Sequence, residues 1–265
     1  MWQRKLQNLL SEWIIVEPII ILYILSNAMV GIPTQNIYLA KFTNNTGCLE
    51  EAEKLTDSFI RDTTILYAGL SALVMLVMGP LSDKYGRKYG LLWSVAFTGL
   101  SNTVFGGLYF LDQREILHID ISYYYIPAVL LGLGGANYAF FLQIFSYVGD
   151  LSSAKPETRL RRFTLSETAI GFGVISGYCL GSIVVQELGD LYIFIICGSS
   201  NVVAFVYGLL RVKNIIPDVI GNNNENEKVQ HNQVCHFSLI LFSLEESSES
   251  IQRISCYTVS PKRGF

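Results

Sequence analysis

Charged residues are scarce in this sequence, and those present are clustered. Asp, Glu, Lys and Arg together make up 15% of the 265 residues, whereas 51% are hydrophobic. The mean hydropathy is +0.37. The clustering leaves long stretches almost free of charge, which favours a membrane protein over a soluble domain.

Cysteine and histidine are sparse as well, with five and three copies. The cysteines form no C-x-x-C pair and show no spacing with histidine that suits a metal, so we expect neither a metal site nor a disulfide framework. No nucleophile and base stand out as a pair, so the sequence does not predict an enzyme, and no cofactor is expected. The chain also lacks a basic patch with interleaved aromatic residues, which argues against a nucleic-acid partner.

Six long apolar runs dominate what is present. A spanning helix needs about 20 mostly apolar residues, and a chain in lipid must satisfy its own backbone hydrogen bonds. The runs cover residues 13–31, 63–81, 89–111, 123–149, 163–186 and 191–210. The sequence therefore predicts an all-α polytopic membrane protein with six transmembrane helices and the lipid bilayer as its partner. The fourth run is long enough to require tilt or to protrude from the bilayer.

The runs divide the chain into three parts. Residues 1–12 form an N-terminal segment, residues 13–215 a six-helix bundle, and residues 216–265 a polar tail that we expect to be disordered. A later apolar run, residues 234–244, has only 11 residues and is too short to cross a bilayer.

Basic residues are distributed unevenly between the two sides of the predicted bundle. The N-terminus, the loops after runs two and four and the end of run six hold eleven, and the opposite loops hold four. The positive-inside rule therefore places the N-terminus and the tail in the cytoplasm. We expect residues 32–62 to form a polar loop on the other side, where the sequon at Asn44 is open to glycosylation.

The stretch between runs two and three is the most distinctive one. It reads Gly79-Pro-Leu-Ser-Asp83-Lys-Tyr-Gly86-Arg87-Lys88, with four charged side chains between two apolar runs. It predicts a short, tight cytoplasmic turn. Asp83 and Arg87 are four residues apart and would pair on one face of a helical turn, which is worth only about 0.3 kcal/mol if the pair is exposed.

Two acidic residues interrupt apolar runs. Glu17, followed by Pro18, lies in run one, where a proline bends a helix and a carboxylate is costly unless it is paired or wet. Glu17 is either a cavity or gating residue or an interfacial glutamate. Glu167 lies at the start of run five, where a low dielectric favours the neutral carboxyl and suits a proton relay. The alternative for Glu167 is an ion pair with Arg159 or Arg162 at the cytoplasmic interface.

Small residues recur at four-residue spacing in run five, at Gly173, Gly177 and Gly181. Such a face lets a neighbouring helix approach closely, so helix packing is the main interpretation. A face that slides or lines a cavity is the other. Asp150 ends run four, where it either caps the next turn or pairs with the basic loop that follows.

Several of these segments together resemble one family of transporters. The turn at residues 79–88 resembles the signature loop between helices 2 and 3 of the major facilitator superfamily. With Val16-Glu17-Pro18, Ile126-Pro127, Gly132-Leu-Gly-Gly135, Tyr147-Val-Gly-Asp150 and Leu165-Ser-Glu167-Thr-Ala-Ile-Gly171, it is similar to the solute carrier family of the proton-coupled folate transporter and its lysosomal relatives. The resemblance covers about residues 13–215.

The resemblance implies roles for individual residues. It implies proton coupling for Glu167, with a proton gradient as the driving force, and conformational cycling for Asp83, Arg87 and Asp150, with Gly79 and Gly86 shaping the turn. It also implies that Cys48 has a disulfide partner in a C-terminal half, and that the membrane is the plasma membrane or the lysosomal membrane. Ala128 stands where the folate transporter has an arginine, which argues against folate itself.

The superfamily forms its substrate path between two six-helix halves, and this sequence supplies the N-terminal one. The expected function is therefore proton-coupled transport of a small organic solute by alternating access, with this chain as a truncated half. Asp83 and Arg87 are then one side of a latch whose other side is absent. The alternative is a non-transporting half that dimerises with itself, through the glycine face, or modulates a full-length relative.

Overall fold

The computed structural model describes residues 16–114, 116, 119–152, 156–212 and 214, which belong to one compact unit within residues 1–217. The described part is helical throughout, without strands. Its elements are α2 (Glu17–Thr46), α3 (Leu49–Tyr85), α4 (Arg87–Gln113), the 3-10 helix η1 (Ile121–Tyr124), α5 (Tyr125–Leu133), α6 (Ala136–Ser152), α7 (Pro156–Glu187) and α8 (Asp190–Arg211). The predicted segments 1–12 and 216–265 lie outside the described residues.

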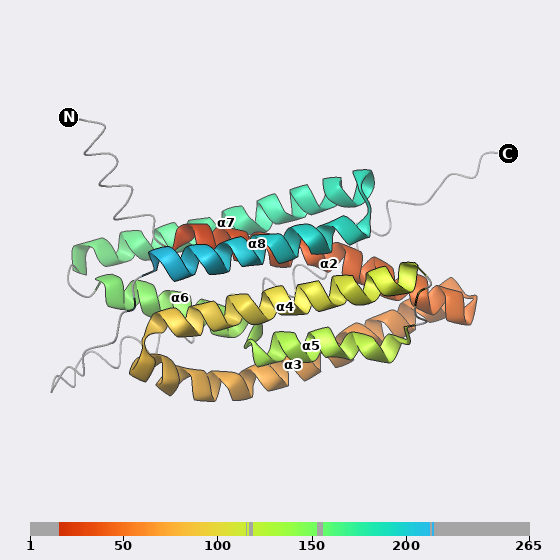
Figure 1. Ribbon diagram of the computed structural model, residues 1–265, viewed down its shortest axis with the longest axis horizontal. Helices are drawn as coiled ribbons and strands as arrows, with labels where there is room; N and C mark the ends of the chain where they lie inside the picture. The colour runs from red at the N-terminus through yellow and green to blue at the C-terminus, as the bar shows by residue number, and fades with distance from the viewer. Residues whose placement is uncertain (1–15, 115, 117–118, 153–155, 213, 215–265) are drawn as a thin grey trace. The chain divides into compact units, whose positions relative to one another are not determined.

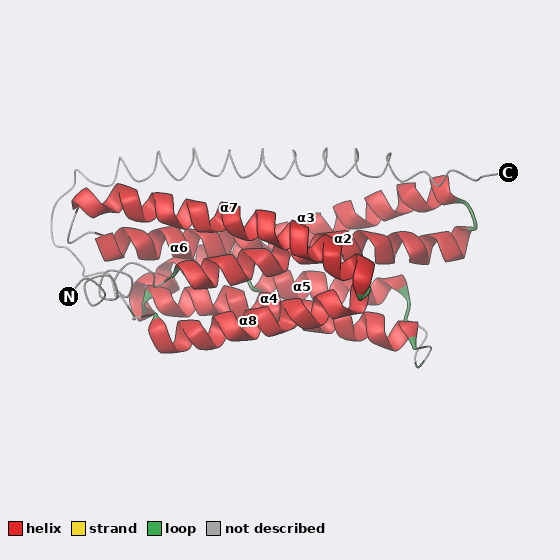
Figure 2. Ribbon diagram, turned by 90° about the horizontal axis from the view of Figure 1, so that it is seen from above, coloured by secondary structure: helices red, strands yellow, loops and turns green. Residues whose placement is uncertain are grey.

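Six spans run side by side in alternating directions (Figures 1 and 2). Within the described residues, six helical stretches are long and apolar enough to cross a membrane, with α5 and α6 counted as one. This confirms the predicted all-α fold with six transmembrane helices. α2 packs along α7 and α8, while α4 packs along α8 and the α5–α6 pair.

The prediction of a polar loop at residues 32–62 is wrong. α2 continues to Thr46, and Gly47, with a φ of 69°, ends it by donating its N–H to the carbonyl of Thr43 at 2.9 Å. α3 begins only two residues later, at Leu49. Helices of 30 and 37 residues exceed the roughly 20 that a bilayer requires, so this end of the pair extends beyond the apolar runs.

A buried aromatic cluster explains why the extension is helical despite its polar sequence. Tyr38 of α2 packs edge-on against Phe59 of α3 at 4.9 Å between ring centroids and against Tyr124 of η1 at 5.7 Å. Nearby, the ammonium of Lys41 binds the carboxylate of Asp112 at 3.1 Å and the carbonyl of Ile119. Packing of these side chains outweighs the local polar composition.

Pro18 does not bend the first span. α2 begins at Glu17, so Pro18 lies in the first turn, where its missing N–H has no helical partner to lose. The proline inside α2 is Pro33, within the stretch predicted as loop.

Run four is two helices. The chain breaks at Gly134 and Gly135, and Gly135 and Ala136 have φ values of 77° and 45°. Only glycine adopts positive φ at little cost, so Gly135 permits the break, whereas Gly134 keeps a helical φ of −72° and Ala136 adopts its positive φ at some cost. Figure 1 shows α5 and α6 following one another along α4.

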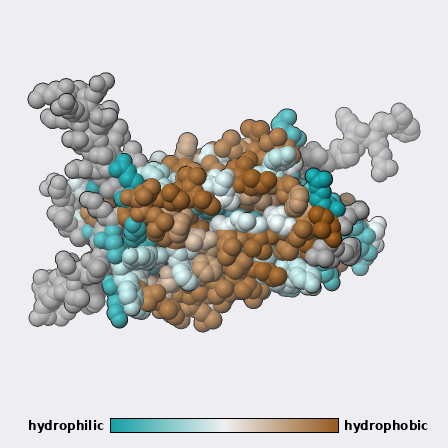
Figure 3. Space-filling view, viewed as in Figure 1, coloured by the Kyte–Doolittle hydropathy of each residue, from teal (hydrophilic) through white to brown (hydrophobic). Residues whose placement is uncertain are grey.

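Hydrophobic side chains cover the middle of the helices on the face in Figure 3, and hydrophilic ones gather toward the ends. On α3 and α7, large apolar side chains are highly exposed, for example Leu76 (74% exposed) and Ile175 (68% exposed). Exposure on this scale is what lipid contact requires, in agreement with an integral membrane protein.

Candidate functional site

Arg87 lies at the centre of an ion network at one end of the bundle. Its guanidinium contacts Oδ1 of Asp83 at 2.6 Å and donates from Nε to Oδ2 of Asp150 at 2.9 Å. The Arg87 side chain is 16% exposed, Asp150 27% and Asp83 56%. The planar, multi-donor guanidinium suits this arrangement, because one side chain can serve two carboxylates.

The network joins three helices. Asp83 lies in the last turn of α3, Arg87 in the first turn of α4 and Asp150 near the end of α6. The predicted pairing of Asp83 with Arg87 is present, but it crosses the junction between two helices. Arg87 as the partner of Asp150 was not anticipated. Both carboxylates that bind Arg87 are thus within the described bundle. Whether Asp83 and Arg87 also form one side of a latch with a second half stays a prediction.

The turn that carries the network is a single residue. Gly86 has φ 106° and ψ 149°, a region that is essentially restricted to glycine, and its N–H caps α3 through the carbonyl of Ser82 at 2.9 Å. A Cβ at Gly86 would lie 1.9 Å from Oδ1 of Asn214. The rest of the predicted turn is helical, because α3 continues to Tyr85 and α4 begins at Arg87.

A buried polar contact lies beside the network. Ser82 donates to Oε1 of Gln143 at 2.7 Å, and both side chains are almost fully buried. A Cβ at Gly90 would approach Gln143 to 2.6 Å, so α4 comes as close to α6 as glycine allows. Gln143 was missed in the sequence, although a lone glutamine in an apolar run is the kind of residue that could have been noticed.

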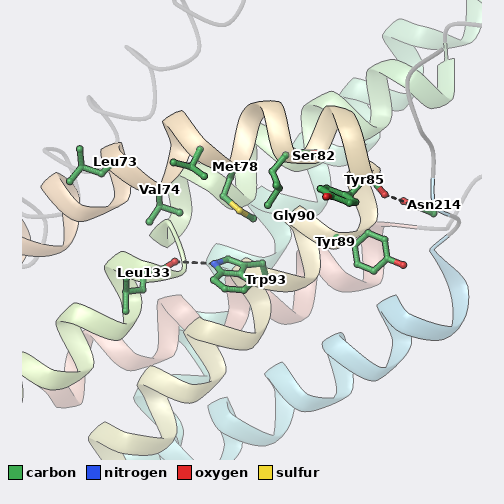
Figure 4. Close-up of a pocket in the computed structure, with 12 residues that line it drawn as sticks. Leu73, Val74, Met78, Ser82, Tyr85, Tyr89, Gly90, Trp93, Leu133 and Asn214 are labelled. Atoms are coloured by element: carbon green, nitrogen blue, oxygen red, sulfur yellow. Dashed lines mark hydrogen bonds between the residues drawn. The ribbon is translucent and has the colours of Figure 1, made fainter. Parts of the chain in front are cut away.

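The break in span four exposes carbonyls that other helices satisfy. The indole of Trp93 donates to the carbonyl of Leu133 at 3.0 Å (Figure 4). The hydroxyl of Ser94 donates to the carbonyl of Gly134, also at 3.0 Å. Tyr23 of α2 donates to the carbonyl of Ala136 at 3.3 Å. Lipid offers no hydrogen bonds, so an interrupted helix is tolerated only where protein groups replace the lost ones.

A buried cluster around Tyr23 adjoins this break. The Tyr23 ring stacks on Phe140 at 3.6 Å between centroids, and its hydroxyl lies 3.2 Å from Oγ1 of Thr98. One turn along α2, Asn201 of α8 donates to Oγ of Ser26 at 2.9 Å. The interior of the bundle is therefore cross-linked by polar contacts between α2, α4, α6 and α8.

Glu17 and Glu167 have contrasting environments. Glu17 is buried, and its Oε2 accepts the backbone N–H of Val16 at 3.1 Å, at the very start of α2. Glu167 is exposed on α7, and no described residue forms an ion pair or hydrogen bond with it. The alternative pairing of Glu167 with Arg159 or Arg162 is not observed among the described residues. Arg159 is eight residues away, about 12 Å along the helix, and Arg162, five residues away, points to a different side of it.

The glycines of run five pack inside the bundle. A Cβ at Gly177 would lie 2.7 Å from Cβ of Ala28 and 2.8 Å from the carbonyl oxygen of Leu25, and Gly173 and Gly181 are similarly close to α2. All three are buried. α2 thus occupies the face that was considered for dimerisation, and that argument for a dimer is wrong.

The comparisons with known proteins add one decisive match. The family's sequence model, described as Major Facilitator Superfamily, matches residues 18–245. The chain belongs to the Major Facilitator Superfamily. No curated protein matches the sequence.

Membership in the Major Facilitator Superfamily makes this chain part of a family of membrane transporters for solutes, not of enzymes.

The structure assigns no role to three other predicted residues, Gly79, Asn44 and Cys48. Gly79 lies inside α3 with nothing within 4 Å of an added Cβ. Asn44 is exposed in the last turn of α2, and Cys48 is an exposed free thiol at the start of α3. Among the described residues, no group of three or more His, Cys, Asp or Glu side chains could hold a metal.

Proposed function

We propose that this superfamily member carries out proton-coupled transport of a small organic solute by alternating access. The observation that carries the proposal is the unpartnered carboxylate of Glu167 on the exposed face of α7. Glu167 is 11 residues from the start of α7, about 16 Å along the helix, so it is well inside the helix.

A carboxylate facing lipid at this depth would be costly. The face of α7 that holds Glu167 is therefore expected to border water or another group of helices. In such a place the carboxyl group binds a proton when it is desolvated and releases it when it meets water. This exchange is what coupling to a proton gradient requires.

Alternating access requires each half of a transporter to move as a body against the other. The described bundle suits such motion, because the Arg87 network holds α3, α4 and α6 together at one end and Lys41 joins α2 to Asp112 at the other. We propose that a second six-helix half meets the exposed faces of α3 and α7 and completes the path.

The substrate proposal depends on the resemblance to the solute carrier family of the proton-coupled folate transporter. It favours a small organic anion, in the plasma or lysosomal membrane, and the departure at Ala128 favours non-folate solutes. We also propose that the end of the bundle that holds Arg87 faces the cytoplasm and that Asn44, at the other end, is glycosylated.

Transport by the full chain in proteoliposomes tests the proposal. A panel of labelled organic anions, with folate included, is offered under an inward-directed proton gradient. We expect accumulation above protein-free vesicles that a protonophore abolishes. Accumulation equal to that of protein-free vesicles for every solute would reject autonomous transport by this chain.

The alternative is a non-transporting half that modulates a relative. Because α2 covers the glycine face, a partner would have to bind an exposed apolar face of the bundle, such as the one around Leu76 of α3. Crosslinking from a cysteine at position 76 in membranes tests it. If only monomer is trapped and co-expression leaves a relative's transport unchanged, the alternative is rejected.

A further inference from the structure

Two buried amide side chains near the middle of the bundle have incomplete hydrogen bonding. Asn201 of α8 is 1% exposed and Asn102 of α4 is 7% exposed. Within the described part of the chain, Oδ1 of Asn201 and Nδ2 of Asn102 have no hydrogen-bond partner. Lipid supplies none at this depth, and leaving a buried amide unpaired is costly, so both atoms call for a ligand.

The other contacts of Asn201 fix the orientation of its amide. Nδ2 donates to Oγ of Ser26 at 2.9 Å and to the carbonyl of Cys197 at 2.8 Å. Ser26 donates its own hydroxyl proton to the carbonyl of Tyr23 at 2.9 Å, so toward Asn201 it can only accept. Turning the amide over would place its oxygen against two acceptors. The free atom of Asn201 is therefore the oxygen, which is an acceptor.

The register of α4 and α8 brings Asn102 toward this oxygen. A Cβ at Gly99 would lie 3.0 Å from Cβ of Asn201, so the two helices touch at this level. Asn102 follows Gly99 by three residues, and Thr98, beside Gly99, contacts Tyr23 of α2 through its hydroxyl. At about 100° per residue, Asn102 projects between α2 and α8. Side chains lean toward the N-terminus of their helix, and α4 and α8 run in opposite directions, so Asn102 and Asn201 lean toward each other (Figure 1).

The chemistry of the two free atoms selects the ligand. One is an acceptor and the other a donor, and a water molecule can donate to the first and accept from the second. The N–H of Asn102 would repel a cation. An anion would find no counter-charge, because the neighbouring side chains of Ser26, Cys197 and Thr98 are neutral. Buried waters in proteins typically complete the hydrogen bonds of such groups.

We propose that an ordered water molecule binds at the junction of α2, α4 and α8, donating to Oδ1 of Asn201 and accepting from Nδ2 of Asn102. The water ties α4 to α8 in the middle of the membrane, beside the bond through which Asn201 ties α8 to Ser26 of α2. The proposal is independent of the solute, of proton coupling and of a second half, because the junction lies inside the bundle.

Radiolytic footprinting tests the site. X-rays split a bound water into hydroxyl radicals, which oxidise the side chains beside it even where bulk solvent does not reach. Cys197 is 0% exposed, and its carbonyl binds Asn201. With the full chain in lipid nanodiscs, we expect irradiation to oxidise Cys197, whereas a small thiol reagent added to the solvent should leave it unmodified.

Two variants of α4 provide the contrast. Asn102→Leu keeps the shape of the side chain but removes its donor. It should abolish the oxidation of Cys197 and lower the melting temperature, because Oδ1 of Asn201 then loses the water that binds it. Thr103→Val removes the exposed hydroxyl of the next residue, which donates to the carbonyl of Gly99 within α4, and should change neither result.

Four results would overturn the proposal. Absence of Cys197 oxidation in the unmodified chain would mean that no water lies beside it, and this result needs no variant to fold. Modification by the thiol reagent would mean that bulk solvent enters the bundle. Oxidation that Asn102→Leu leaves unchanged would place the water elsewhere. A higher melting temperature for Asn102→Leu would mean that the amide is unpaired in a dry core.

Discussion

At the scale of single residues, replacing Arg87 should lower stability more than replacing Asp83. The pair with Asp83 is about half exposed and contributes little, whereas the contact with Asp150 is mostly shielded from water. Removing the guanidinium would take a close counter-charge away from Asp150 in a poorly solvated place, which costs more than the loss of an exposed pair.

We therefore expect Arg87→Gln to lower the free energy of unfolding by roughly 2 kcal/mol and Asp83→Asn by much less. The double variant Arg87→Gln with Asp150→Asn should be more stable than the sum of the single changes predicts, because it removes both members of the better shielded pair and leaves only the half-exposed Asp83 without Arg87. Denaturation of the detergent-solubilised protein measures this, with Arg61→Gln, an exposed arginine of α3, as the control. Additive losses would contradict the network.

Two glycines of the same stretch should respond in opposite ways. Gly86→Ala is strained by its positive φ, which alanine rarely adopts, so we expect clear destabilisation. Gly79→Ala has free space within α3 and should be neutral or stabilising by up to about 1 kcal/mol. The melting temperatures of the two variants test this difference. Similar values would contradict a turn that depends on Gly86 alone.

At the scale of elements, the close contact between α2 and α7 depends on glycines of α7, which have no side chain. Gly177→Ala would place a methyl group within 2.8 Å of the Leu25 carbonyl oxygen and force the helices apart, at a cost of roughly 1–3 kcal/mol. Gly171→Ala on the same helix meets nothing within 4 Å and serves as the matched control. If both variants unfold alike, the glycines do not act through α2.

The elements also indicate how far sequence reasoning reaches. Hydropathy located all six spans, because lipid demands long apolar runs. It missed the extension of α2 and α3, because aromatic contacts such as Tyr38 with Phe59 are made between distant segments. It missed the broken span, although Gly134 and Gly135 were visible, because the donors Trp93 and Ser94 come from another helix.

The candidate site was predictable only in part. Asp83 and Arg87 stand four residues apart in a recognisable motif, so their pairing could be expected. The contact with Asp150 joins residues 63 positions apart, and no local pattern encodes it. Whether Asp83, Arg87 and Asp150 act as a conformational latch stays a prediction.

At the scale of the whole molecule, basic residues gather at one end of the bundle. The ends of α3, α6 and α8 and the starts of α4 and α7 lie at one end of the bundle, together with Lys84, Arg87 and Lys88 (Figure 1). Cys48 lies at the other end and is exposed. The positive-inside rule predicts that the Arg87 end faces the cytoplasm.

Labelling by a membrane-impermeant maleimide checks this orientation. With the remaining cysteines replaced by serine, Cys48 should react from the outside or lumenal face. In the same background, with Cys48 also replaced by serine, Lys84→Cys should react only after permeabilisation. The reverse pattern would show the opposite orientation and contradict the prediction from the positive-inside rule.

Glu167→Gln tests the central claim, proton-coupled transport, most directly. The amide mimics the protonated carboxyl group, so solute exchange across proteoliposomes should persist while accumulation driven by a proton gradient is lost. Glu187→Gln, at the far end of α7, should retain both activities. Gradient-driven accumulation by Glu167→Gln at the level of the unmodified protein would contradict the account.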